Sequence, residues 1–562
     1  MSGVRAWSAL CTVLAAFGCS ADITGDGPNG NAGTAGNTGT AGGPSTSTLG
    51  RDAVAERCEA SQLAPPQLRR LTAKELDRTL RDVFPSLSAS GWKGVRLGAD
   101  PVSSLGFSND ARTLVVATQT AQELLGTAED VAEALVSGGG LASLVPCAAE
   151  AGAGRACADE VVQGVGARLF RRPVAAAEAA EYGALFDSVA GKSDFATGAR
   201  WTLVALMQSP HAVYRSELGT GDGTRRLDGY ELASQLSYTF GGSAPSPELL
   251  QAGERGELAD PATRVAKAKE LLATPAGQEQ LHQFLAEWSG YGRVASKTKT
   301  TVTGFEALRG SMLQETGLFL GEAVVARRGG VRELLTASYT YLDGALSQLY
   351  GYGAVTGNDF QLVERPPGQG LGLLAQGSML AGSAHSDASS PTLRGLVVYE
   401  KLMCHQKPAP LAVIPMIEPP SPGNKTTRER YEASHGANAG CAACHKFFDP
   451  LGFGFEHFDE AGRYRETEQG LTIDASGQAV EYPEATPAFS FNGLDDLATQ
   501  LAGQEAVADC VSGLAAAYAF AGAGGRTCLA ETARAAFARG DVGVLDYFAE
   551  LAAAPSFAER AP

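Results

Sequence analysis

The sequence lacks the features that mark nucleic-acid-binding and membrane-spanning proteins. Its 562 residues carry 62 acidic and 45 basic side chains, a formal net charge of −17, and contain no basic run. A nucleic-acid-binding face needs concentrated Lys and Arg, so we expect no nucleic-acid partner. Beyond the N-terminus, no stretch reaches the roughly 18 uninterrupted apolar residues that a membrane-spanning helix requires.

Common hydrolase and nucleotide-binding signatures are also missing. The chain has no G-x-S-x-G elbow, no H-E-x-x-H helix and no P-loop, which argues against the enzyme classes that depend on them. His and Cys are scarce, with 7 and 10 residues. A motif that needs both residue types is therefore seldom produced by chance.

The N-terminus is predicted to be a targeting segment. Residues 6–18 form an apolar stretch that is too short to span a bilayer. The stretch ends in Ala16-Phe17-Gly18-Cys19, which resembles a bacterial lipobox, so residues 1–18 are predicted to be a signal peptide and Cys19 to be lipidated. The resemblance implies an outer-membrane lipoprotein, because Ser20 is not the Asp that directs inner-membrane retention. An ordinary secretory signal is the alternative, and either one predicts export to the periplasm or cell surface.

Apolar periodicity predicts a mainly α fold. Thr72 and Glu75 have the spacing of a capping box, and helical patterns continue through most of the chain. Residues 19–55, rich in Gly, Asn, Thr and Ser, are predicted to be a flexible tether. The Pro-rich residues 406–424 are expected to be extended. Residues 470–482, with Ser476-Gly477 in the middle, predict a small β-hairpin in the C-terminal third.

Cys441, Ala442, Ala443, Cys444 and His445 spell C-x-x-C-H, the pattern for covalent attachment of a c-type haem. Two thiols on one short turn add to the two vinyl groups of a haem, and the adjacent His supplies an axial nitrogen to iron. Haem c is therefore the predicted cofactor, with His445 as the proximal ligand.

Residues after the motif suit the surroundings of a haem. The carbonyl of Pro450 is a candidate acceptor for the imidazole N–H of His445. An apolar wall is expected from the Phe residues that follow, for which ordinary core packing is the alternative: Phe447, Phe448, Phe453, Phe455 and Phe458. His385 or His435 is the candidate distal ligand, with ordinary hydrogen-bonding roles as the alternative.

Other uses of the Cys pair remain open. A zinc site needs four ligands, which His435 and His457 would complete. A dithiol redox pair would need a βαβ context, which the sequence lacks. A structural disulfide is the third alternative.

The remaining Cys residues suit an oxidising compartment, because six of them are left to pair. They are Cys58, Cys147, Cys157, Cys404, Cys510 and Cys528. Proximity favours the pairs Cys147–Cys157 and Cys510–Cys528, which leaves Cys58–Cys404 by elimination.

From about residue 58 to 555 the chain resembles secreted bacterial multidomain proteins built from tandem domains of unknown function, of the planctomycete cytochrome c-like type. The resemblance is carried by short motifs along the chain and most strongly by the last of them: Leu68-Arg69-Arg70-Leu71-Thr72, Ala167 to Pro173, Gln208-Ser209-Pro210, Ser390-Pro391 with Arg394-Gly395, and Cys441 to Arg465. Relatives tend to carry Met at the position of Phe448, which implies one fewer candidate sulfur near the iron.

The resemblance implies five tandem helical modules and a c-type haem, and it supplies no substrate. The expected modules are residues 56–136, 145–218, 225–350, 365–466 (the C-x-x-C-H module) and 467–557. The leading hypothesis is a surface-tethered c-type haem protein that passes electrons to an unknown redox partner. The alternatives are a peroxidase-like haem oxidoreductase, with His385 or Arg394 beside an open distal site, and a non-redox scaffold or binding lipoprotein with the Cys pair bridged or zinc-bound.

Overall fold

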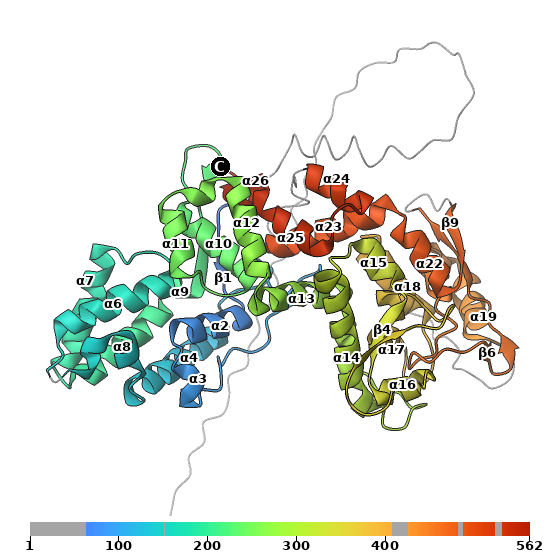
Figure 1. Cartoon of the computed structure of the whole chain (residues 1–562), viewed down its shortest axis with the longest axis horizontal. Coiled ribbons are helices and arrows are strands. Elements are labelled where there is room, and N and C mark those ends of the chain that lie inside the picture. Colours follow the sequence, from blue (N-terminus) through green and yellow to red (C-terminus); the bar gives the residue numbers. More distant parts are fainter. Residues whose placement is uncertain (1–62, 151, 354, 407–424, 482–486, 523–530) are drawn as a thin grey trace, which may run out of the picture. The chain divides into compact units, whose positions relative to one another are not determined.

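The computed structural model describes residues 63–150, 152–353, 355–406, 425–481, 487–522 and 531–562. Helices dominate these residues, and the strands within them form two-stranded antiparallel sheets (Figure 1). The predicted mainly α class is therefore confirmed. None of the described helices is long and apolar enough to cross a membrane.

The first helices enclose their own core, which includes the buried side chains Leu80, Val131 and Leu203. The elements in chain order are β1 (Gln67–Arg70), α2 (Ala73–Val83), α3 (Leu87–Ser90), α4 (Thr118–Ser137), α5 (Gly140–Leu144), α6 (Arg155–Phe170), α7 (Ala176–Ala190), α8 (Phe195–Gln208), α9 (Pro210–Val213) and β2 (Tyr214–Glu217). The capping box predicted for Thr72 and Glu75 is confirmed at the start of α2, because each side chain accepts a hydrogen bond from the backbone N–H of the other.

A larger core includes Phe107 and buried side chains from Leu227 to Phe557, and takes in most of the remaining helices. Its first elements are β3 (Arg225–Arg226), α10 (Gly229–Gly241), α11 (Pro247–Glu254), α12 (Pro261–Leu272), α13 (Pro275–Ser289), α14 (Phe305–Leu320), α15 (Val331–Thr336), β4 (Tyr339–Leu342), α16 (Gly344–Tyr350) and β5 (Gln361–Glu364).

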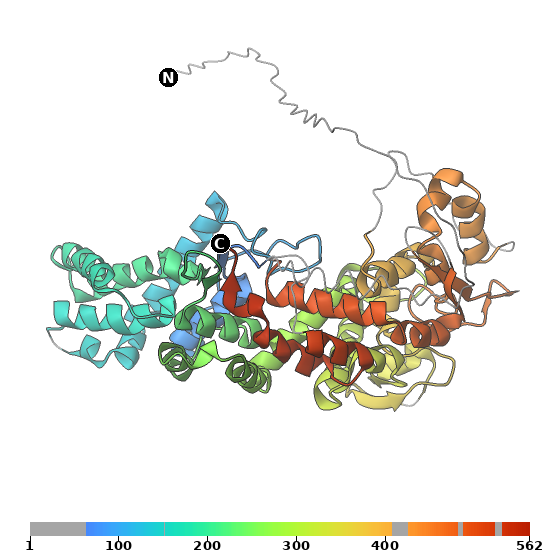
Figure 2. The same ribbon diagram turned by 90° about the horizontal axis from the view of Figure 1, so that it is seen from above.

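The same core continues into the C-terminal elements. They are α17 (Gly377–Gly382), α18 (Pro391–Val397), α19 (Thr427–Tyr431), α20 (Ala439–His445), α21 (Asp449–Phe453), β6 (Thr467–Glu468), β7 (Leu471–Thr472), β8 (Ser476–Val480), β9 (Pro487–Asn492), α22 (Gly493–Ala502), α23 (Glu505–Ala519), α24 (Glu531–Arg539), α25 (Val544–Glu550), α26 (Pro555–Ala558) and β10 (Glu559–Arg560). Figure 2 shows the last helices, in red, beside the green α10 to α13, and α25 packs against α12.

The small β-hairpin predicted for the C-terminal third is confirmed, but the turn predicted at Ser476-Gly477 within residues 470–482 is wrong. Ser476 lies opposite Asn492 and Gly477 opposite Phe491, so these two residues begin a strand instead of forming a turn. Gly477 is required for close packing, because a Cβ atom there would lie 2.3 Å from the Phe491 ring. A separate short hairpin joins β6 to β7.

One predicted disulfide is confirmed and the other pairings are corrected. Cys147 bonds to Cys157, as expected. Cys510 bonds to Cys404, so the predicted pairs Cys510–Cys528 and Cys58–Cys404 are wrong. Folding brings the Cα atoms of Cys404 and Cys510 to 5.4 Å although they are 106 residues apart in sequence. Cys19, Cys58 and Cys528, the tether and most of the Pro-rich segment lie outside the described residues.

Candidate functional site

The two motif thiols lie one helical turn apart on α20. The side chain of Asn438 caps this helix by accepting hydrogen bonds from the backbone N–H groups of Gly440 and Cys441. Cys441 is buried and Cys444 is half-buried, and both are unpaired, whereas the other four described Cys residues form disulfides. The alternative in which this pair forms a disulfide is therefore wrong.

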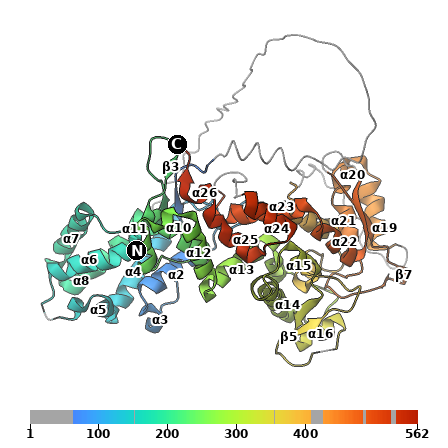
Figure 3. The ribbon, with the colours of Figure 1, turned by 45° about the horizontal axis from the view of Figure 1, so that its top comes forward.

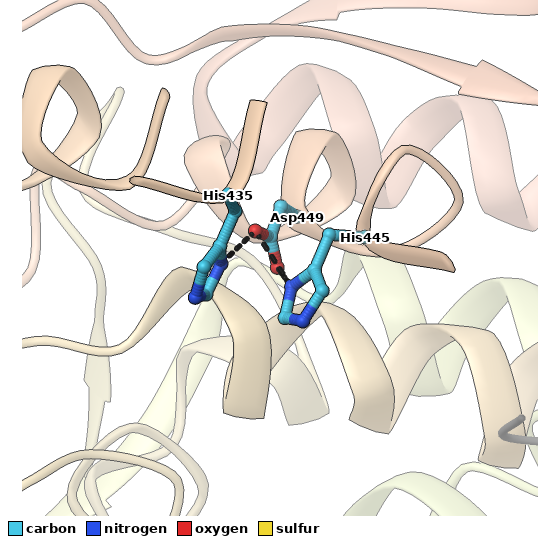
Figure 4. Close-up of side chains that lie close together, drawn as sticks. All are labelled: His435, His445 and Asp449. Carbon is cyan, nitrogen blue, oxygen red and sulfur yellow. Dashed lines mark hydrogen bonds and ion pairs between the residues drawn. The ribbon is translucent and has the colours of Figure 1, made fainter. Parts of the chain in front are cut away.

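Two imidazoles share one carboxylate at the end of this helix (Figure 4). Nδ1 of His445 lies 3.0 Å from Oδ2 and 3.1 Å from Oδ1 of Asp449, and Nδ1 of His435 lies 2.8 Å from Oδ2. The ring centroids of the two His residues are 3.8 Å apart. Both rings direct their Nε2 atoms away from Asp449, and neither Nε2 has a hydrogen bond within the described residues.

The short helices α18, α19, α20 and α21 position these groups. Figure 3 labels α19, α20 and α21 close together. α19 continues as a π-helical turn, Glu432–Gly436, which carries His435. α20 ends at His445, and α21 begins at Asp449. π-Helical turns are rare in proteins overall, but a large share of them occur at functional sites.

α18 supplies a further contact because it crosses α21 at very short range. A Cβ atom at Gly452 would lie 1.8 Å from the carbonyl oxygen of Pro391, and one at Gly395 would lie 1.8 Å from that of Phe448. Only glycine allows two backbones to approach so closely. As a result, the hydroxyl of Thr392 reaches Asp449 and donates to Oδ1 over 2.6 Å.

Asp449 is held as a carboxylate. It is 5% exposed, and burial by itself raises its pKa. The hydrogen bonds from His435, His445 and Thr392 outweigh burial and hold the pKa of Asp449 below its ordinary value. The site therefore contains a buried negative charge with donors from three helices.

The sequence alone predicted no role for Asp449 or Thr392. The signal that points to Asp449 is its spacing of four residues from His445, which corresponds to about one helical turn. No comparable signal exists for Thr392, since it reaches the site through the crossing of α18 and α21.

The two candidate distal ligands lie near one another. Nε2 of His385 lies 3.5 Å from the hydroxyl of Tyr431, and the Tyr431 ring packs against His435 at a centroid distance of 5.1 Å. Lys299 holds the loop that carries His385, because its ammonium donates to the carbonyls of Ala384 and His385. Figure 4 shows the two imidazoles on either side of the Asp449 carboxylate, each with its Nδ1 directed toward it.

The residues after the motif are placed differently from expectation. The carboxylate of Asp449, and not the predicted Pro450 carbonyl, is the hydrogen-bond partner of the His445 imidazole. The Pro450 carbonyl lies against Gly477. Phe447, Phe448, Phe455 and Phe458 belong to the large core, and Phe448 also contacts the His445 ring at a centroid distance of 4.8 Å. Phe453 lies under the guanidinium of Arg428.

Arg394 and His457 form hydrogen bonds with backbone carbonyl groups. The Arg394 guanidinium is buried and donates to the carbonyls of Leu380, Phe455, Phe458 and Asp459. Nδ1 of His457 lies 2.9 Å from the carbonyl oxygen of Arg465. Arg394 is thus not available as the polar residue of a peroxidase-like distal site.

The metal-binding potential of the described residues is concentrated at the shared carboxylate. One nitrogen or oxygen each from His435, His445 and Asp449 lie within 4.8 Å of one another, and this cluster includes no Cys. A zinc site built on the Cys pair with His435 and His457 is therefore not assembled among these residues.

Comparison with known proteins identifies four consecutive domains. Residues 69–137 match PSD3, a protein of unknown function (DUF1587), and residues 157–217 match PSD5 (DUF1595). Residues 227–352 match PSD4 (DUF1592), and residues 371–468, which contain the shared carboxylate and the Cys pair, match PSCyt3 (DUF1588). No curated protein and no solved structure matches the chain. With these four domains in tandem, the chain belongs to the planctomycete-type multidomain family of unknown function.

Proposed function

We propose that the protein is a surface-tethered c-type haem protein that serves electron transfer. The observation that carries the proposal is the pair of unpaired thiols one turn apart on α20, directly before a His whose Nδ1 is engaged by a buried carboxylate. This donor set fits a c-type haem, since two thioether bonds and one free imidazole nitrogen are what the attachment requires.

Each residue then has a definite task. Cys441 and Cys444 would hold the haem through two thioether bonds, each formed by addition of one thiol S–H across one vinyl group, which needs no oxidant. His445 would ligate the iron through Nε2, while Asp449 holds its Nδ1. The haem supplies a one-electron couple. The engagement of Arg394 by four backbone carbonyls favours electron transfer over a peroxidase-like oxidoreductase.

A pyridine haemochrome spectrum tests the cofactor. The protein is produced with a c-type maturation system, and we expect covalent haem in the wild type and none in Cys444→Ser. Cys147→Ser is the matched control, because this Cys lies in a disulfide and its loss should leave haem attachment intact. Wild-type protein without covalent haem would overturn the proposal. A low-spin spectrum is expected, and a high-spin ferric spectrum would favour the oxidoreductase.

We further propose export and a lipid anchor at Cys19. The two disulfides support an oxidising compartment, because such bonds are rare in the cytosol. The variant Cys19→Ala should move the protein from the membrane fraction to the soluble periplasmic fraction. Unchanged fractionation would contradict the anchor.

A second candidate is a mononuclear divalent metal site. The cluster of His435, His445 and Asp449 favours it, because two imidazoles and a carboxylate suit zinc or ferrous iron with an open position. Metal analysis of the same preparations separates the two candidates. Stoichiometric metal without covalent haem would support the second one.

A further inference from the structure

The shared carboxylate has a consequence for the electronic properties of the motif His. A carboxylate that accepts the Nδ1–H of a ligating His fixes the ring and raises the basicity of Nε2. Asp449 is 5% exposed, so its interaction with His445 over 3.0 Å is little screened by water. An electron-rich axial imidazole stabilises the oxidised iron and lowers the midpoint potential.

His435 forms a hydrogen bond with the same carboxylate. Its Nδ1 lies 2.8 Å from Oδ2, closer than the 3.0 Å of His445 to the same oxygen. The π-helical turn and the Tyr431 ring hold His435 in this position, and 12% of its side chain is exposed. Each additional donor to a carboxylate reduces the electron density that the carboxylate passes to the others. Removal of His435 should therefore strengthen the hydrogen bond that His445 donates to Asp449.

We propose that Asp449 is the positioning residue that makes the His445 imidazole electron-rich, and that His435 limits this effect by sharing the carboxylate. The inference rests on the proposed haem function and deepens it. It predicts that the loss of Asp449 and the loss of His435 change the midpoint potential in opposite directions.

Redox titration of the haem-loaded full chain tests this. Asp449→Asn keeps the shape of the side chain and removes its charge, so the midpoint potential should rise. His435→Phe keeps a ring against Tyr431 and leaves the carboxylate to His445, so the potential should fall. Thr392→Val is the control, because it removes a neutral donor to Oδ1 and should cause only a small fall.

The two proposals fail in different ways. With haem attached, potentials that stay unchanged, or that move in the same direction in Asp449→Asn and His435→Phe, would overturn the inference and leave the proposed function intact. Wild-type protein that attaches no haem would overturn both. If Asp449→Asn does not fold, the fall expected in His435→Phe still decides, since a merely structural role for His435 predicts no directed change.

Discussion

At the scale of single residues, Glu456 is a buried acid with one carboxylate oxygen that accepts no hydrogen bond within the described residues. It is 1% exposed, its Oε2 accepts a hydrogen bond from Ser389, and its Oε1 has no partner among the described residues. Burial raises the pKa of Glu456 to about 7, against the opposing charges of Arg394 and Arg465. This side chain should therefore exchange a proton near neutral pH.

The stability of the protein should depend on this proton. Between about pH 4.5 and 7 the folded state binds the proton and the unfolded state does not, so wild-type stability falls as the pH rises. Glu456→Gln lacks this loss, so its stability relative to wild type should increase by about 3 kcal/mol from pH 4.5 to 8. Urea unfolding at several pH values measures it. Ser389→Ala removes a hydrogen bond that lowers the pKa of Glu456, so its stability should keep falling to a higher pH than that of wild type. A pH-independent difference between Glu456→Gln and wild type would contradict the assignment.

At the scale of elements, the close crossing of α18 and α21 is what assembles the site. The glycines at 395 and 452 let each helix touch the backbone of the other, and this contact brings Thr392 against Asp449. The resemblance already marked Gly395 as part of a motif, but its purpose becomes clear only in the packed structure.

Gly452→Ala should separate these helices. The added methyl group would meet the carbonyl of Pro391, and such overpacking costs roughly 1–3 kcal/mol or more. We expect a lower free energy of unfolding in urea and weaker haem retention. Gly164→Ala on α6 is the matched control, because nothing lies within 4 Å of the new methyl group, and it should raise stability by roughly 0.5–1 kcal/mol. Wild-type stability in Gly452→Ala would refute the role of the crossing.

At the scale of the whole molecule, C-terminal residues contact segments from the first half of the chain. β10 pairs with β3, and Arg560 joins Arg69 around the buried carboxylate of Glu217. The disulfide Cys404–Cys510 likewise links α23 to an inner part of the module that contains the shared carboxylate. The contact of Arg69 with Glu217 connects two domains that the family comparison separates. Arg560 and Cys510 lie beyond the last matched domain and bond to Glu217 and Cys404 within matched domains.

Loss of this disulfide should cost more than loss of the short one. Closing a longer loop removes more entropy from the unfolded chain, so the double variant Cys404→Ser, Cys510→Ser should lose about 2 kcal/mol more than Cys147→Ser, Cys157→Ser. Urea unfolding under non-reducing conditions compares them. Equal losses would show that chain entropy does not govern the difference.

The sequence by itself determined the features that depend on local spacing. Helical periodicity predicted the mainly α class, and the Thr72–Glu75 spacing predicted a cap that is present. The separation of ten residues was enough to pair Cys147 with Cys157. The C-x-x-C-H spacing placed two thiols and an imidazole on one turn, because three to five consecutive positions of a helix are fixed relative to one another.

Only the tertiary structure decided the contacts between distant segments. Cys404 forms a disulfide with Cys510, which is 106 residues away in sequence, and Thr392 donates a hydrogen bond to Asp449, which is 57 residues away. The pairing of Gly477 with Phe491 and the sharing of Asp449 by His435 and His445 likewise follow from how helices and strands pack. Such contacts depend on shape and burial summed over many residues, which no local pattern encodes, and so the motif predicted a ligand while the fold selected the carboxylate that holds it.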